Sequence, residues 1–94
     1  MQDDDIEWDD RKAASNFARH GVTFEAARGV FRDPFALEFS DDREDYGEER
    51  FVVIGMAGGR MLVVVYTLRD ERIRLISARG AEPHEQRHYH EQNR

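Results

Sequence analysis

Apolar residues recur at two different spacings along this chain, and the change of spacing separates a helical part from a strand part. A first helix is predicted over residues 10–20, capped by Asp9 or Asp10, because apolar residues recur there at helical spacing. The residues of this apolar stripe are Ala13, Ala14, Phe17 and Ala18. Thr23 is the predicted cap of a second short helix over residues 24–31, whose apolar positions are expected in the core.

Polar residues of the first helix also follow a pattern. Lys12, Asn16 and His20 are spaced by four residues, so they form a polar row along one margin of the apolar stripe. A row in that position borders any groove between the helix and the surface it packs on. These residues are therefore candidates for a site.

Most of the predicted strands follow the two helices. One short strand is predicted before the first helix, where Ile6 and Trp8 alternate with acidic residues. Apolar and β-branched runs predict further strands over residues 35–39, 51–56, 61–68 and 72–78. The third of these runs is apolar on both faces, which is typical of a central strand, and residues 57–60 before it have the composition of a hairpin turn. Pro83 stands near the start of a last helix that reaches past Tyr89.

These elements predict one α+β domain over residues 1–94. Two N-terminal helices and a C-terminal helix are expected to pack on a four- to five-stranded, mainly antiparallel sheet. Residues 1–5 are expected to be disordered, and residues 81–94 to form the C-terminal helix and tail. The N-terminus is acidic, the chain has no cysteine, and its longest apolar run, residues 61–66, is far too short for a membrane span. We therefore expect a cytoplasmic protein without a membrane partner.

The distribution of charge matters more than its sum. A net charge of -6 argues against a nucleic-acid partner. However, 13 of the 20 acidic residues lie in residues 1–10 and 38–49, whereas residues 50–80 hold six arginines and two acids. The chain has 13 arginines and one lysine, and the planar fork of arginine suits bidentate contact with phosphate, although a GC-rich genome explains the bias equally well. The sheet is thus a candidate surface for a polyanion.

The last helix contains a literal zinc-hydrolase motif. His84-Glu85-Gln86-Arg87-His88 matches H-E-x-x-H, in which two histidines bind the metal and the glutamate acts as general base. A third ligand would have to be His20, His90 or Glu91. The motif lies in the last eleven residues, so little chain remains to wall a substrate cleft. A charged terminal helix that carries histidines explains the motif better, and we expect no metal and no other cofactor.

Several short motifs stand in an order and spacing that chance does not explain. They are Ile6-Glu7-Trp8-Asp9 with Lys12 and Asn16, residues 19–27, Val30-Phe31, Asp33-Pro34, Glu49-Arg50, Ile54-Gly55, residues 64–67 and residues 73–79. Together they resemble the BrnT family of bacterial toxins from residue 6 to about Tyr89. The chain departs from the family pattern at Ala81-Glu82-Pro83-His84, where a Lys/Thr-rich segment is expected. Glu85, Arg87 and Tyr89 still fit the family pattern, which accounts for Glu85 without zinc.

The resemblance implies a RelE-like fold and a ribonuclease toxin of a type II toxin-antitoxin system, which cleaves RNA and arrests translation. It also implies a cognate BrnA-like antitoxin that neutralises the toxin, in a heterotetrameric complex that represses its own operon through the antitoxin. The first alternative is a non-catalytic protein-interaction module, and the second is the zinc hydrolase. Growth arrest on expression would separate the toxin from the interaction module.

A metal-independent ribonuclease uses the RNA 2′-hydroxyl as nucleophile and needs a base, an acid and cations for the developing charge. Arg74 and Arg79 are candidates to clamp the phosphate, with surface ion pairs as the alternative. His20, at a helix C-terminus, is a candidate acid or anchor, with a simple helix cap as the alternative. Lys12 is a further catalytic candidate that meets phosphate, with an exposed helix lysine of no function as the alternative. Glu49 is the candidate base, and a strand-start ion pair with Arg50 explains it equally well.

Four more residues are expected to contact RNA. Arg50 either orients Glu49 or binds phosphate. Tyr66 either stacks on a base or lies in the core. Arg69 and Ser77 belong to the same basic sheet and are expected to contact RNA there. Strict alternation puts Arg74 and Arg79 on opposite faces of their strand. They can share a site only if the strand bulges, and we predict this break near Ser77.

Overall fold

The change of spacing along the chain corresponds to a change from helices to strands in the computed structural model, which describes residues 5–43, 45 and 47–94. The helical elements are α1 (Asp10–His20), α2 (Phe24–Ala27), the 3-10 helix η1 (Arg28–Arg32) and α3 (Pro83–Gln92). The strands are β1 (Ile6–Glu7), β2 (Leu37–Ser40), β3 (Arg50–Ala57), β4 (Arg60–Arg69) and β5 (Arg72–Gly80).

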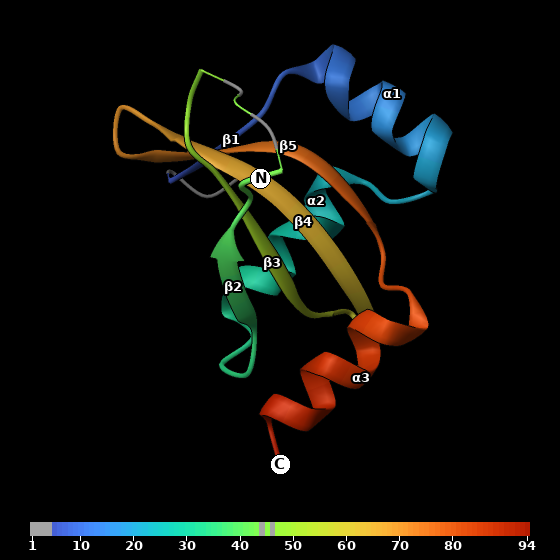
Figure 1. The fold of residues 1–94 in the computed structure, drawn as a ribbon. Coiled ribbons are helices and arrows are strands. Elements are labelled where there is room, and N and C mark those ends of the chain that lie inside the picture. The colour runs from blue at the N-terminus through green and yellow to red at the C-terminus, as the bar shows by residue number, and fades with distance from the viewer. Residues whose placement is uncertain (1–4, 44, 46) are drawn as a thin grey trace.

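The five strands form one sheet in the order β1-β5-β4-β3-β2 (Figure 1). β1 runs parallel to β5, and the other neighbours are antiparallel. β4 is therefore the central strand, as its apolar pattern on both faces predicts. The α+β fold, its element order and its mainly antiparallel sheet are confirmed.

The two faces of the sheet differ in what covers them. The face toward α1, α2 and η1, here called the helix-covered face, carries the larger core. Its most buried large apolar side chains are Phe24, Val30, Leu62, Val64 and Leu75. The opposite face, here called the open face, carries a smaller cluster at the end where α3 docks (Figure 1). This cluster consists of Val52, Ile54, Val63 and Tyr89.

Helix α1 turns its polar row toward the sheet, and most of its apolar stripe faces away. Phe17 is 53% exposed, and only Ala13 of the stripe contacts the core, whereas Asn16 is 6% exposed. The Nδ2 of Asn16 donates to the carbonyls of Val22 (3.0 Å) and Ala78 (2.9 Å), and its Oδ1 accepts from the Ala78 N–H (3.0 Å). β1 pairs only with the start of β5, so this amide makes the hydrogen bonds that a neighbouring strand would make.

The second predicted helix is shorter than expected. Thr23 caps it as predicted by accepting the Ala26 N–H (3.0 Å), but α2 ends at Ala27 and the chain tightens into η1. A Cβ at Gly29 would lie 2.8 Å from the Cβ of Ala57, so η1 approaches β3 too closely for a side chain unless one of the two segments shifts. Gly29 permits this contact, but glycine also destabilises an α-helix. The chain therefore continues as a short 3-10 helix instead of a longer α2.

The strand after Asp33 begins at Leu37, two residues later than predicted, because a turn comes first. The Oδ1 of Asp33 accepts the Phe35 N–H (2.9 Å), and its Oδ2 accepts the Met56 N–H (2.7 Å) and the Tyr89 hydroxyl (2.7 Å). Burial alone would raise the pKa of Asp33, but these hydrogen bonds together lower it. Burial and Asp33 raise the pKa of Tyr89 to about 12. One carboxylate thus joins the turn, β3 and α3.

Some predictions concern segments that lie partly outside the described residues. Residues 1–4 of the expected disordered N-terminus lie outside them, whereas the Asp5 carbonyl accepts the Ile73 N–H (2.7 Å). Positions 44 and 46, within the acid-rich stretch over residues 38–49, also lie outside. Among the helices that the structure describes, none has the length and apolar character needed to cross a membrane.

Candidate functional site

Strand β5 contains the break in alternation that Arg74 and Arg79 require. The register between β4 and β5 shifts between Val65 and Tyr66, which leaves Ile76 as an extra residue on β5. This bulge changes which residues of β5 share a face. Both arginines consequently lie on the open face, and the predicted break is confirmed.

Rows of directly opposed residues cross the open face, because residues paired across two strands point to the same side. The middle row consists of Ser77, Val65, Val52 and Phe39, from β5 to β2. Arg79, opposite Val63, belongs to the row on the α3 side, and Arg74 belongs to the row on the other side. The rows of the two arginines are four β4 residues apart, which is about 13 Å at the usual rise of a strand.

A groove of about 440 Å³ lies over these rows. Its floor and walls consist of Arg19, His20, Phe39, Ser40, Asp41, Asp42, Arg43, Val52, Val63, Val65, Ser77, Arg79 and Glu85. A smaller hollow of about 200 Å³ lies between α1 and β5, and Lys12, Asn16, His20 and Ser77 line it. Three other predicted site residues therefore gather around Ser77: Lys12, His20 and Arg79. The polar row of α1 borders a hollow, as predicted.

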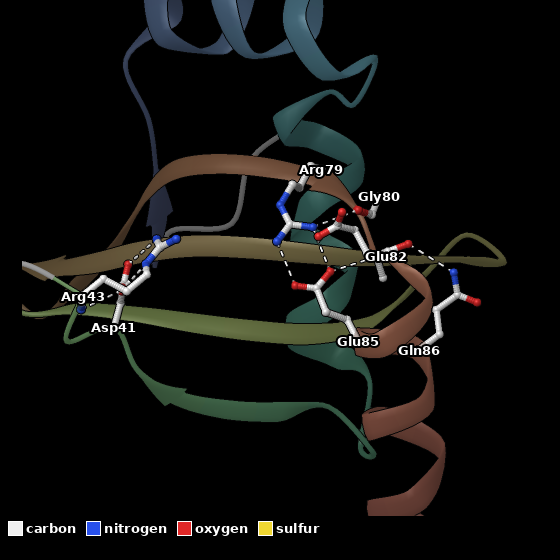
Figure 2. Close-up of polar contacts among 8 residues, drawn as sticks. Asp41, Arg43, Arg79, Gly80, Glu82, Glu85 and Gln86 are labelled. Carbon is white, nitrogen blue, oxygen red and sulfur yellow. Dashed lines mark hydrogen bonds and ion pairs between the residues drawn. The ribbon is translucent and has the colours of Figure 1, made fainter.

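Arg79 is held at the edge of the groove by a glutamate of α3 (Figure 2). Its Nη1 and Nη2 donate to the two carboxylate oxygens of Glu85, each at 2.8 Å, and Nη1 also donates to the Gly80 carbonyl (3.2 Å). The Glu85 side chain, 14% exposed, also accepts the Glu82 N–H (2.8 Å). Its pair with Arg79 lowers the pKa of Glu85 and raises that of Arg79. Among the described residues, the Nε–H of Arg79 has no partner.

The opposite wall of the groove contains a second ion pair, drawn on the left of Figure 2. The Nε and Nη2 of Arg43 donate to the carboxylate of Asp41 at 2.7 and 2.8 Å. The bonds from Arg43 outweigh the burial of Asp41 and lower its pKa. The groove thus has an ion pair at each side and aliphatic side chains between them.

Arg74 is engaged by the acidic N-terminal segment. Its Nη1 donates to one carboxylate oxygen of Glu7 (2.7 Å), and the Nε of Arg72 donates to the other (2.7 Å). The hydrogen bonds from Arg74 and then Arg72 lower the pKa of Glu7. Arg74 therefore makes an ion pair with an acidic stretch, which was the alternative explanation, and it does not line the groove. The carboxylate that pairs with Arg79 belongs instead to α3.

The structure does not bring Glu49, Arg50 and Arg69 together with His20 and Arg79. Glu49 and Arg50 line a separate hollow of about 320 Å³ in the acidic loop, which shares residues 40–42 with the groove. The Nε of Arg50 lies 3.9 Å from Glu48, and the Nη2 of Arg69 lies 3.5 Å from the same carboxylate. These side chains flank the groove at its loop end.

Tyr66 lies on the helix-covered face, away from the groove. It is 6% exposed, stacks on Phe51 at 5.3 Å between ring centroids, and donates its hydroxyl to Glu38 (2.5 Å). Burial and then Glu38 raise its pKa. The aromatic ring on the groove floor is Phe39, which was not among the site residues predicted from the sequence. Alternation in β2 separates Phe39 from Glu38, but the sequence does not reveal which face stays open.

The H-E-x-x-H residues do not form the arrangement of a zinc hydrolase. Among the described residues, the potential ligand atoms of Glu82, His84 and Glu85 lie within 4.8 Å of one another, and His88 is not in this group. The motif needs Glu85 as a free base, but its carboxylate is engaged by Arg79. Glu85 belongs instead to the groove.

Comparison with known protein families gives one finding. Residues 8–85 match the family model described as the ribonuclease toxin BrnT of a type II toxin-antitoxin system. The matched range includes every residue that lines the groove, from α1 to the first turn of α3. The comparison with curated proteins gives no match.

Proposed function

The chain belongs to the BrnT family of ribonuclease toxins of type II toxin-antitoxin systems, and we propose that it cleaves RNA in the groove of the open face. One observation carries the location. The bulge at Ile76 places Ser77 and Arg79, which share a face by alternation, on the open face beside His20, so a cation, a hydroxyl and an imidazole line one groove. These are group types that a metal-independent ribonuclease needs.

The scissile phosphate binds at Arg79. Glu85 occupies one N–H of each terminal nitrogen of the guanidinium, which leaves the Nε–H and the second proton of Nη2 as a parallel pair of donors. Such a pair matches two oxygens of a phosphate. Lys12, across the neighbouring hollow, adds a second positive charge on the other side of Ser77.

Proton transfer is the second requirement. In the proposed reaction, a base removes the proton of the 2′-hydroxyl, the oxygen attacks phosphorus, and the 5′-oxygen leaves with a proton from the acid. We assign the acid role to His20, because an imidazole exchanges protons near neutral pH. Glu49, the base suggested by the sequence, lines a separate hollow that meets the groove only at residues 40–42, so we do not assign it the base role at this phosphate. The products are a 2′,3′-cyclic phosphate and a 5′-hydroxyl.

Three arginines lie toward the end of the sheet away from Arg79. Arg74 belongs to a row about 13 Å from that of Arg79. Arg50, opposite Thr67 in the same row as Arg74, and Arg69 lie toward the same end of the sheet. We propose that these three arginines contact phosphates further along the RNA, exchanging Glu7 and Glu48 for the polyanion.

Membership of a family of type II toxins implies that the protein has an antitoxin partner. We propose that cleavage arrests translation in the cytoplasm and that a BrnA-like antitoxin neutralises the toxin. The complex is a heterotetramer that represses its own operon through the antitoxin. Growth after expression with and without the neighbouring antitoxin gene tests neutralisation directly.

The test of the enzyme is RNA cleavage by the purified protein in the presence of a chelator. We expect cyclic-phosphate products, a loss of about 100-fold in Arg79→Ala, and full activity in the matched control Arg87→Ala. Arg87 is exposed on α3 and does not line the groove. Intact RNA at micromolar enzyme overturns the proposal. Antitoxin binding without cleavage would identify an interaction module, and activity that returns only with added zinc would identify a zinc hydrolase.

A further inference from the structure

Phe39 is a large apolar side chain in an unusual position. It is 46% exposed on the edge strand β2, with its ring on the floor of the groove. The other large exposed apolar side chains, Phe17, Phe35 and Leu68, do not line this groove. Its neighbours in the same row of the open face are Val52 and Val65. The ring therefore continues an aliphatic floor that remains accessible from the groove.

The groove combines two kinds of surface. The groove floor, which Phe39 forms with the neighbouring valines, is apolar. The side of the groove next to α1 and α3 carries Arg19, His20 and the N–H groups of Arg79 that Glu85 does not take. A nucleotide has the same two-sided character, with an apolar base face and an anionic phosphate. An apolar protein segment would satisfy the floor but leave the donors on that wall without an anion.

We infer that Phe39 is a stacking platform for a nucleobase of the bound RNA, next to the phosphate held at Arg79. This inference rests on the proposed function. Aromatic rings bind bases because every base has a π-face, so stacking on one ring holds single-stranded RNA without fixing its sequence. Phe39 thereby takes the role that the sequence suggested for Tyr66, which is buried on the other face.

The distance across the sheet limits which base stacks. Phe39 and Ser77 are the two ends of one row, separated by three strand spacings or about 14 Å. A base on Phe39 therefore belongs to a nucleotide one or two positions from the scissile phosphate. Removing that one base should weaken binding, whereas removing bases further away should not.

The experiment compares four variants on a short single-stranded RNA of mixed sequence, after the cleaved bond has been located. Phe39→Leu and Phe39→Ala test the ring, Phe39→Tyr restores it, and Phe35→Leu is the matched control for an exposed phenylalanine outside the groove. Thermal melting checks that each variant is folded. Affinity is measured with the 2′-O-methyl form of the RNA, which cannot be cleaved by its own 2′-hydroxyl.

We expect Phe39→Leu and Phe39→Ala to lose about tenfold or more in affinity, and Phe39→Tyr and Phe35→Leu to bind like the wild type. An abasic nucleotide one or two positions from the scissile phosphate should weaken the wild type and leave Phe39→Leu unchanged. Wild-type affinity and abasic sensitivity in Phe39→Leu would overturn the platform while cleavage stands. Loss of antitoxin binding alone would assign the ring to the protein interface, and absence of cleavage by the wild type would refute the proposed function itself.

Discussion

Replacing Asn16 with alanine isolates the contact that fixes α1 to the sheet. The amide makes three hydrogen bonds, two with Ala78 and one with Val22, at 2.9 to 3.0 Å. Ala78 is fully buried and Val22 almost so, which leaves little access for water to replace the amide. The substitution removes all three bonds and leaves three backbone groups without their partner.

The magnitude follows from these three groups. At about 1 kcal/mol for each net hydrogen bond, Asn16→Ala should lower the free energy of unfolding by about 3 kcal/mol. For a domain of this size, that loss corresponds to a fall of roughly 12 to 24 °C in the melting temperature. Asn16→Asp should cost at least as much, because a carboxylate cannot donate to the two carbonyls that the amide now contacts.

Urea unfolding followed by circular dichroism measures this difference directly. The midpoint should fall while the dependence on urea concentration stays the same. Ser15→Ala, at the neighbouring exposed position of the same helix, is the control and should change stability by less than about 0.5 kcal/mol. A loss below about 1 kcal/mol in Asn16→Ala would refute the reasoning, since Ala78 would then have found other partners.

Three further substitutions test other contacts. Tyr89→Phe should lower the free energy of unfolding by about 1.5 kcal/mol. The effect should be smaller in the Asp33→Asn background, because the Tyr89 hydroxyl donates to the Asp33 carboxylate. If chemical denaturation showed the two substitutions to be additive, this reasoning would be wrong. Glu85→Gln should destabilise the protein at pH 7. Because the pKa of Glu85 is lowered in the folded protein, the stability that its carboxylate contributes is fully present above pH 4.5, the ordinary pKa of a glutamate. This stability is lost as the pH falls through the lowered pKa. A difference in urea midpoint between Glu85→Gln and the wild type that does not change with pH would contradict this reasoning. Gly29→Ala should cost about 1 to 3 kcal/mol through its contact with Ala57, and an unchanged melting temperature would show that η1 can shift.

The fold was largely predictable because its signals are local. Helix caps at Thr23, the glycine-rich turn over residues 57–60 and the apolar run of β4 each act through neighbouring residues, and all of them appear as predicted. The face that α1 buries was not predictable from its apolar stripe. It depends on Asn16 meeting β5, 62 residues later in the chain.

The site was predictable only in part, for a similar reason. Lys12, His20, Ser77 and Arg79 were selected by residue type, and the fold places them in two adjoining hollows that share His20 and Ser77. Phe39 was missed, because the sequence does not say which face of the sheet the helices leave uncovered. Ion pairs such as Arg79–Glu85 also join separate elements, and only the folded arrangement pairs each arginine with its carboxylate.

The extra residue in β5 makes the count of residues in this strand more important than the identity of any one of them. Deleting Ile76 would restore strict alternation, so one of the two flanking arginines would point into the helix-covered core. Substituting Ile76 leaves the count intact. Over evolutionary time, this segment should therefore accept exchanges of side chains far more readily than insertions or deletions of a single residue, because the latter invert the strand beyond the change.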